Sequence, residues 1–275
     1  MEDPILSPDE VASCETETRR KYSGETAIGY SADSVSRQPA KDSGDYFDCL
    51  LRIRMDFAGE FARGKRVLDV GCANGAHLLA LAGMVRHGIG VDFSRPLIRR
   101  AREERNRAGA ERVDFVVGNA RSMPFRDGCF DFAYSFSSLY YMPNVEEVIR
   151  EIARVLAPGG SCLVEMGNSR SLNALVADAY PELARSFHLE VSQMKKILRD
   201  AGFDIFFHEA CQILPYWGDR PRRIEFWLRP FWKRWFQRRL GRKMIDERVS
   251  NFPLVRNFAF RHLFLCNKGL RINES

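Results

Sequence analysis

The fold of this 275-residue chain is decided by the stretch Val67-Leu68-Asp69-Val70-Gly71-Cys72-Ala73-Asn74-Gly75. It begins as a short apolar strand and ends in a turn that holds two glycines. Gly71 and Gly75, with two small residues after the first of them, let the backbone approach a ligand without collisions of a Cβ atom. A helical pattern follows at once. A strand, a glycine turn and a helix in this order predict the first unit of an α/β sheet, with a ligand at the turn.

Outward from this stretch, strands and helices alternate. We expect strands over 66–70, 88–92, 113–117, 129–135, 161–166, near 204–209 and over 260–266, and helices over 46–61, 76–84, 96–107, 145–156 and 191–201. Such alternation predicts an α/β fold: a doubly wound, mostly parallel seven-stranded sheet with helices on both faces. The ligand of such a sheet lies beyond the carboxyl ends of its strands.

Two acidic residues indicate the kind of ligand. Asp69 lies beside the glycine turn, where a carboxylate would repel a pyrophosphate and suit a positively charged group. Asp92 ends the second strand, where a carboxylate can accept both hydroxyls of a ribose, although an acid at the start of a helix is also common for structural reasons. A nucleoside with a cationic tail satisfies both, and S-adenosylmethionine is such a molecule.

Four motifs carry a resemblance to a known family. VLDVGCANG (67–75) resembles the first motif of the class I S-adenosylmethionine-dependent methyltransferases, in particular the methyltransferase type 11/25 domain. The likeness continues through GIGVDFS (88–94), GNARSMPFRDGCFDFAYS (118–135) and REIARVLAPGG (150–160), and it covers roughly residues 65–211. The resemblance implies S-adenosylmethionine as the cofactor and methyl transfer as the activity.

The resemblance also implies roles for single residues. Asp69 and the glycine turn would surround the methionine end of the cofactor, Asp92 would hold the ribose, and Phe93 would lie against the adenine. Asn119 and Ala120 stand where the family usually has Asp-Ala, and an asparagine can accept the same hydrogen bond through its amide oxygen. The expected cofactor contacts are Asp69, Gly71, Cys72, Ala73, Asn74, Gly75, Asp92, Phe93, Asn119, Ala120 and Ser135.

The candidate catalytic residues are Tyr140, Tyr141 and His188. The two tyrosines follow the fourth strand, where many relatives carry a histidine. A tyrosine can orient an acceptor hydroxyl, but with a pKa of ~10 it is a poor base, and an aromatic packing role competes with the catalytic one. His188 has the side chain of a general base, with a structural histidine as the alternative. The five histidines show no metal-ligand spacing, so we expect no metal site.

Residues 220–243 form a basic and aromatic segment. Ten basic and two acidic residues lie between Asp219 and Lys243, a surplus larger than the net charge of +6 of the whole chain, so the remainder is slightly acidic. Apolar residues recur there at spacings of three and four, as on one face of a helix. The segment could cap a substrate site, lie in a membrane interface, or bind nucleic acid or protein. The slightly acidic remainder disfavours nucleic acid.

The amino-acid composition indicates how the chain is divided into regions and which cellular compartment it suits. Residues 1–45 are rich in Ser, Asp, Glu and Thr, which predicts a mobile arm or a lid, with a plain disordered terminus as the alternative. Residues 46–275 form the expected methyltransferase domain, with an insertion at about 212–259. Seven scattered cysteines without a Cys-x-x-Cys pair favour a reducing cytosol. No apolar stretch is long enough to span a membrane.

Taken together, the sequence predicts a cytoplasmic or membrane-peripheral methyltransferase. Its expected acceptor is a small molecule, a glycan or a lipid-linked intermediate, with an oxygen nucleophile favoured. An anionic membrane surface is one candidate partner of residues 220–243, and a cap over the substrate site is the other role left open for them. One alternative is an RNA or protein methyltransferase that uses the basic segment. The other is a catalytically silent cofactor-binding adaptor.

Overall fold

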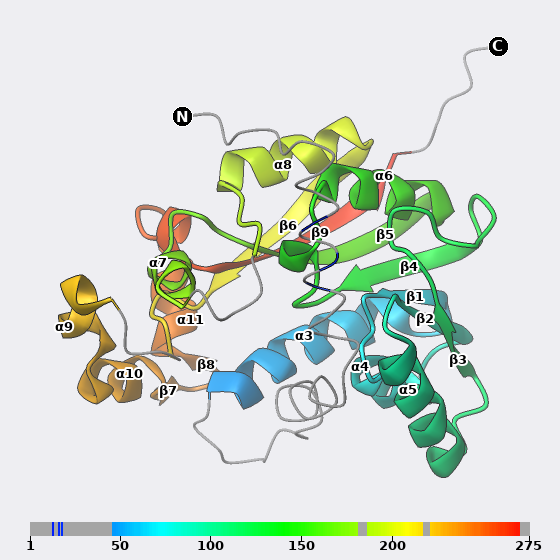
Figure 1. Cartoon of the computed structure of the whole chain (residues 1–275), viewed down its shortest axis with the longest axis horizontal. Helices are drawn as coiled ribbons and strands as arrows, with labels where there is room; N and C mark the ends of the chain where they lie inside the picture. The colour runs from blue at the N-terminus through cyan, green and yellow to red at the C-terminus, as the bar shows by residue number, and fades with distance from the viewer. Residues whose placement is uncertain are drawn as a thin grey trace.

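A sheet of seven strands with helices on both faces forms the centre of the computed structural model (Figure 1). The structure describes residues 46–180, 186–216 and 221–269, together with Ser13, Thr16 and Thr18. The strand order is β3-β2-β1-β4-β5-β9-β6; β9 runs antiparallel to both of its neighbours, and the other pairs are parallel. This confirms the doubly wound, mostly parallel sheet expected from the alternating pattern.

The elements follow the predicted order along the chain. The strands of the sheet are β1 (Arg66–Val70), β2 (His87–Asp92), β3 (Val113–Val117), β4 (Phe130–Ser135), β5 (Leu156–Gly167), β6 (Phe203–Cys211) and β9 (Arg261–Lys268). The larger helices are α3 (Tyr46–Ala62), α4 (Ala76–Leu81), α5 (Arg95–Ala108), α6 (Val145–Val155), α7 (Leu172–Asp178) and α8 (Val191–Asp200). A short 3-10 turn, η1 (Leu139–Tyr141), follows β4.

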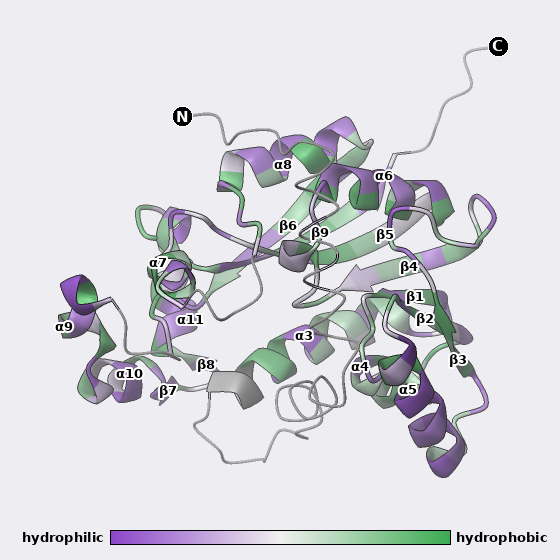
Figure 2. Ribbon diagram, in the orientation of Figure 1, coloured by the Kyte–Doolittle hydropathy of each residue, from purple (hydrophilic) through white to green (hydrophobic). Residues whose placement is uncertain are grey.

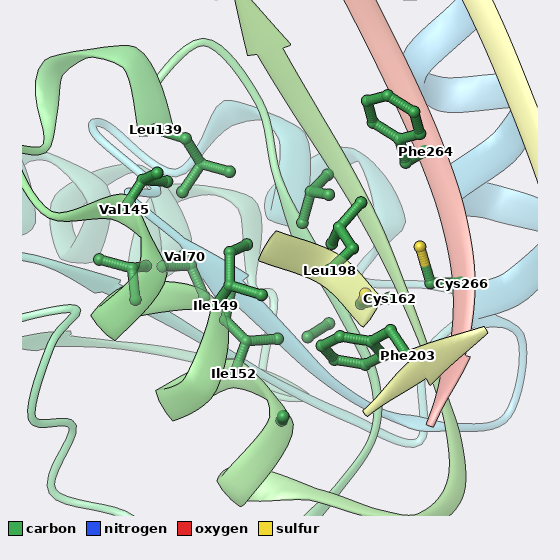
Figure 3. Packing of buried hydrophobic residues seen from close by; sticks show 14 of the residues in the cluster. Val70, Leu139, Val145, Ile149, Ile152, Cys162, Leu198, Phe203, Phe264 and Cys266 are labelled. Carbon is green, nitrogen blue, oxygen red and sulfur yellow. The ribbon is translucent and has the colours of Figure 1, made fainter. Parts of the chain in front are cut away.

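Helices α6 and α8 cover one face of the sheet (Figure 1). Figure 3 shows Val145, Ile149 and Ile152 of α6 directed toward strand residues such as Val70 and Cys162. The apolar residues of α6 recur at spacings of three and four, so they form one stripe on the helix. Each Val or Ile buried in this way stabilises the fold by roughly 1.5–3 kcal/mol.

Helices α3, α4 and α5 cover the opposite face. Leu50 of α3, Leu78 of α4 and Ile98 of α5 pack with strand residues that include Val67 and Phe132. Figure 2 shows the outward side of α5 as strongly hydrophilic, as expected of a helix with one buried face. Each face of the sheet therefore has its own core, and the carboxyl ends of the parallel strands are left for the ligand.

Several boundaries differ from the sequence prediction. Helix α4 ends at Leu81 instead of residue 84, and β5 begins at Leu156 instead of residue 161. The sequence Pro158-Gly159-Gly160 predicts a helix end and a turn, but β5 already pairs with β4 at Leu156 before an irregularity in the register. Helix α7 was not predicted. It follows the end of β5, and Ser171 accepts a hydrogen bond from the Ala174 N–H at its start.

The segment between β6 and β9 is not one helix with a single apolar face, which the spacing of its apolar residues suggested. It holds η2 (Arg222–Ile224), α9 (Glu225–Leu228), α10 (Pro230–Phe236), a hairpin of β7 (Arg239–Leu240) and β8 (Lys243–Met244), α11 (Ile245–Ser250) and η3 (Arg256–Phe258). The helix is broken before Pro230, since Arg229 takes the extended conformation that a following proline favours. No helix in the described part of the chain is long and apolar enough to cross a membrane.

Candidate functional site

A pocket opens at the carboxyl ends of the central strands. Its walls come from the turn after β1, the end of β2, the residues after β3 and the segment after β4, so it lies where a doubly wound sheet binds its ligand. The empty space, counted out to its open mouth, is about 960 Å³. The lining residues are Thr18, Gly71, Ala73, Val91, Asp92, Phe93, Leu97, Gly118, Asn119, Ala120, Arg121, Ser137, Ser138, Tyr141, Met142, Pro143 and Val148.

The turn after β1 is wound tightly by three left-handed residues. Gly71, Ala73 and Gly75 have φ angles of +73°, +49° and +79°. The Gly71 N–H donates to the carbonyl of Val91 at 2.8 Å, which ties this turn to the end of β2. A Cβ on Gly71 would lie 2.6 Å from the Cβ of Ser138. Packing against Ser138 therefore requires a glycine at position 71, and the close approach of a ligand would require one as well.

Asp92 joins two turns at the wall of the pocket. One carboxylate oxygen accepts the Ala73 N–H and the other accepts the Ser94 N–H, each at 2.9 Å. Burial raises the pKa of Asp92, and the backbone hydrogen bonds from Ser94 and Ala73 act against that rise. A carboxylate oxygen can accept more than one hydrogen bond. Asp92 is therefore placed where it could accept hydrogen bonds from the hydroxyl groups of a ligand.

Phe93, Asn119 and Ala120 line the same pocket, as expected for contacts of an adenine. The amide oxygen of Asn119 accepts the N–H of Arg121 at 3.0 Å, which orients the side chain. A second lone pair of that oxygen stays available. Gly118 also lines the pocket and was not singled out from the sequence, although it directly precedes Asn119.

Asp69 lies beneath the pocket and is not among its lining residues. The hydroxyl of Tyr134 donates to its carboxylate at 3.0 Å, and both side chains are buried. Burial raises the pKa of Asp69 to about 8, against the lowering effect of the Tyr134 hydrogen bond and with a further rise from Asp92. Burial therefore favours the protonated form of Asp69 when no positively charged ligand lies near it.

Cys72, Asn74 and Gly75 belong to the turn but do not line the pocket. Cys72 is buried in the core under α4 and α5. Gly75 begins α4, and a Cβ there would lie 2.5 Å from the ring of Phe115. The amide oxygen of Asn74 is buried and has no hydrogen-bond partner in the described structure. These three residues therefore contribute to the conformation of the turn without lining the pocket.

Ser135, at the end of β4, also does not line the pocket. Its hydroxyl donates to the carbonyl of Val70 at 2.9 Å and lies 2.6 Å from the hydroxyl of Ser138. Ser138 reaches the same carbonyl at 3.2 Å and itself lines the pocket. The hydroxyl that meets the pocket is thus three residues further along the chain than the one expected from the sequence.

Of the three catalytic candidates, Tyr141 lines the pocket and the other two lie beyond it. Tyr140 is buried, with its ring centre 6.0 Å from those of His188 and of Phe260. Burial, together with a smaller effect of the charge of Arg261, lowers the pKa of His188 to about 4. His188 is therefore a neutral and weak base at pH 7.

A buried ionic cluster adjoins the pocket at the ends of β4 and β5. Glu165 of β5 is fully buried and accepts two hydrogen bonds from Arg54 of α3, from Nε at 2.7 Å and Nη2 at 2.8 Å. Arg261 at the start of β9 donates to the same carboxylate. Burial alone would raise the pKa of Glu165, but the two guanidinium groups outweigh it and lower the pKa to about 2.

Ser137 connects this ionic cluster to the pocket. Its hydroxyl contacts both guanidinium groups and lies 3.3 Å from Glu165, and the residue has a φ of +52°. A non-glycine residue in this conformation stores strain of about 1–3 kcal/mol. Arg54 was not predicted to be a site residue, although it falls four residues after Leu50 on the buried face of a predicted helix. Nothing in the sequence indicates its pairing with Glu165.

The remaining expectations concern the metal site and the N-terminal arm. In the described part of the chain, no group of three or more His, Cys, Asp or Glu side chains is arranged to hold a metal ion. The expected arm or lid at residues 1–45 lies outside the described residues, apart from Ser13, Thr16 and Thr18. Thr18 is buried and lines the pocket.

The chain is similar in sequence to known methyltransferases. A family model described as a methyltransferase domain matches residues 68–164. The chain is 31% identical over 183 residues to 24-methylenesterol C-methyltransferase 2 of Oryza sativa subsp. japonica, covering 60% of this chain and 49% of the relative. It is 29% identical to methyltransferase GfsG of Streptomyces halstedii, covering 68% of each. The chain thus spans about half to two thirds of these relatives.

Solved structures share the fold. The [4+2]-cyclase SpnF superposes with a TM-score of 0.64 at 21% identity, covering 92% of this chain and 96% of that one. An S-adenosylmethionine-dependent methyltransferase from Thermotoga maritima, titled a possible histamine N-methyltransferase, superposes with a TM-score of 0.58 at 16% identity, covering 91% and 99%. At these identities, the likeness concerns the fold alone.

The role expected of Asp92 leads to a binding prediction. Asp92→Ala should weaken the binding of S-adenosylmethionine by about 2–3 kcal/mol, because charge-assisted hydrogen bonds to the ribose are lost. Isothermal titration calorimetry measures the change, and the exposed Asp200→Ala is the matched control. Because Asp92 also holds two backbone N–H groups, thermal melts must show that the variant is folded. Unchanged affinity in a folded Asp92→Ala protein would rule out the ribose contact.

The raised pKa of Asp69 leads to a prediction about pH. Between pH ~4 and ~8 the folded protein keeps the Asp69 proton while the unfolded chain loses it, so this residue makes the free energy of unfolding fall as pH rises. Asn does not titrate, so the stability of Asp69→Asn should increase relative to wild type by up to about 1.4 kcal/mol per pH unit over this range. Urea denaturation of both proteins across the range gives the difference, and a flat difference would show that Asp69 is ionised in the fold.

Proposed function

We propose that this chain is a class I S-adenosylmethionine-dependent methyltransferase, supported by the methyltransferase-domain model that matches residues 68–164. It would transfer a methyl group to an oxygen of a small-molecule, glycan or lipid-linked acceptor. The observation that carries the proposal is one pocket lined both by the glycine turn with Asp92 and by the segment after β4. Relatives named for 24-methylenesterol, 27-O-demethylrifamycin SV and demethylmenaquinone support a small-molecule acceptor.

The residues present suit this cofactor. Asp92 would accept the ribose hydroxyls, Phe93 and Asn119 would meet the adenine, and the backbone at Gly71 allows close approach because no Cβ intervenes. Asp69, directly beneath, would gain from ionising when a positive charge lies near it. S-adenosylmethionine, when bound, supplies a methyl group activated by a sulfonium.

The acceptor would lie beside the segment after β4. Ser137 and Tyr141 line the pocket there, and the buried cluster of Arg54, Glu165 and Arg261 holds the first of them from behind. A base with a pKa of about 4, such as His188, removes a proton from a hydroxyl poorly. We therefore propose that these residues act by positioning the acceptor oxygen and excluding water, which can supply a large part of a rate enhancement.

Peripheral attachment to an anionic membrane through residues 220–243 is part of the proposal, since a lipid-linked acceptor would be met at a bilayer surface. The rival functions are an RNA or protein methyltransferase and a cofactor-binding adaptor without turnover. The [4+2]-cyclase with the same fold is named for a different reaction, so the fold alone does not decide the chemistry.

Transfer of a radiolabelled methyl group tests the proposal. Purified protein and S-adenosylmethionine labelled in the methyl group are incubated with cell extract separated into small-molecule, lipid, RNA and protein fractions. We expect label in the small-molecule or lipid fraction. Tyr141→Phe should cause at least about a tenfold loss if its hydroxyl positions the acceptor, with cofactor affinity unchanged. Asp200→Ala, at an exposed position on α8, serves as the control.

The other outcomes separate the rivals. Label in the RNA or protein fraction would replace the proposed acceptor class. Cofactor binding by calorimetry without label in any fraction would favour the adaptor. Failure to bind S-adenosylmethionine at all would contradict the whole proposal.

A further inference from the structure

Helices α9 and α10 carry a cluster of aromatic side chains that lies largely in solvent. Phe226, Trp227, Phe231 and Trp235 are all exposed, Phe231 to 65%. Their rings touch through Trp232, whose centre lies 5.5 Å from Phe226, 5.6 Å from Trp227, 5.2 Å from Phe231 and 6.4 Å from Trp235. Contiguous exposed apolar surface of this kind marks an interaction site more often than scattered single residues do. We call these five residues the aromatic cluster.

Exposed arginines surround the aromatic cluster. All of them lie on the elements from η2 to the β7–β8 hairpin, and no ion pair within the described residues engages any of them. They are Arg222, Arg223, Arg229, Arg234, Arg238, Arg239 and Arg242. One is also in contact with the aromatic cluster, since the Arg229 guanidinium lies 5.8 Å from the ring centre of Phe226. This part of the surface is therefore strongly cationic and aromatic at once.

A second apolar stretch lies at the same end of the molecule. The residues after α11 expose Phe252, Leu254 and Phe258, with Leu254 80% exposed. In Figure 1, α9, α10 and α11 all lie at the end of the molecule away from β1–β3. Figure 2 shows hydrophobic and hydrophilic residues interleaved along α9 and α10. The apolar surface thus extends beyond one helix.

We infer that this surface, formed by the aromatic cluster and the surrounding arginines, docks on an anionic lipid bilayer. Two features together favour a bilayer. Arginines are attracted to anionic headgroups by about 1 kcal/mol each near the surface. Phe and Trp side chains gain free energy when they enter the headgroup and acyl boundary, at roughly 25 cal/mol per Å² of apolar area.

Nucleic acid would account for the arginines, and its unpaired bases could stack on some of the exposed rings. It offers no apolar layer for Phe231 or Leu254, and the chain outside the basic segment is slightly acidic. The break before Pro230 also matters, because it divides the predicted stripe into two short helices whose aromatic residues meet at Trp232. The rings are thereby gathered into one exposed cluster, and exposed aromatic side chains of this kind can insert shallowly into a membrane interface.

Vesicle sedimentation of the full-length protein tests this inference. The probes are phosphatidylcholine vesicles with and without phosphatidylserine, at low and at high salt. We expect at least about tenfold stronger binding when phosphatidylserine is present. High salt should weaken the binding without abolishing it, because salt screens only the charge contribution. The measurement needs neither cofactor nor acceptor, so it is independent of the proposed enzyme activity.

Matched variants separate the two contributions. Phe231→Ser with Trp235→Ser should remove the salt-resistant part, while Phe206→Ser, a comparably exposed aromatic on β6, should change nothing. Arg234→Gln with Arg238→Gln should remove much of the preference for phosphatidylserine, while Arg86→Gln with Arg199→Gln, on other parts of the surface, should not. Thermal melts check folding. If the aromatic pair fails to fold, the arginine pair and the wild type still decide the question.

Three results would overturn the inference. The wild type could stay in the supernatant with anionic vesicles at low salt. It could bind vesicles of both compositions equally. Finally, transfer RNA could bind more tightly than the vesicles and be unaffected by the aromatic replacements, which would identify the surface as a nucleic-acid site instead.

Discussion

The carboxylate of Asp92 is the contact on which the ligand end of this fold depends. It accepts one N–H from Ala73 and another from Ser94, so a single side chain joins the turn after β1 to the start of α5. The turn needs that support because three of its residues are left-handed and one of them, Ala73, is not a glycine. With both turns held in this way, this part of the pocket wall is formed by contacts within the protein. A preformed wall of this kind reduces the entropy lost on binding.

A second constraint acts where the acceptor is expected. Glu165 lies beside Arg54 and Arg261, which come from α3 and β9 and are 207 positions apart in the sequence. Removing one member would leave buried charge without its partner, which is costly. These ion pairs therefore hold helix α3 and strand β9 against the end of β5. Ser137, which has a strained conformation, contacts this cluster and also lines the pocket. The cluster therefore helps to fix the position of a pocket residue.

Much of the fold could be predicted because it follows from local patterns. The period of the apolar residues in α6 and the glycine turn after β1 each depend on near neighbours in the chain. Asp92 was expected in the pocket from its position at the end of a strand, whereas Phe93, Asn119 and Ala120 were expected there from the resemblance of their motifs to a known family. A proline at position 230 favours the observed break, whereas the two-residue strands of the β7–β8 hairpin are too short to produce a recognisable pattern.

The sequence by itself determined the order of strands and helices, the ligand end of the sheet and the residues that follow each strand, because these depend on short-range periodicity and on turn chemistry. Only the tertiary structure decided which side chains at that end meet the ligand. Asp69 and Ser135 turn away into hydrogen bonds with Tyr134 and Val70, while Ser138 faces the pocket. It also decided that Arg54 and Arg261 share Glu165. Such pairings join distant segments, and they arise only when packing of the two cores brings the elements together, so no local pattern encodes them.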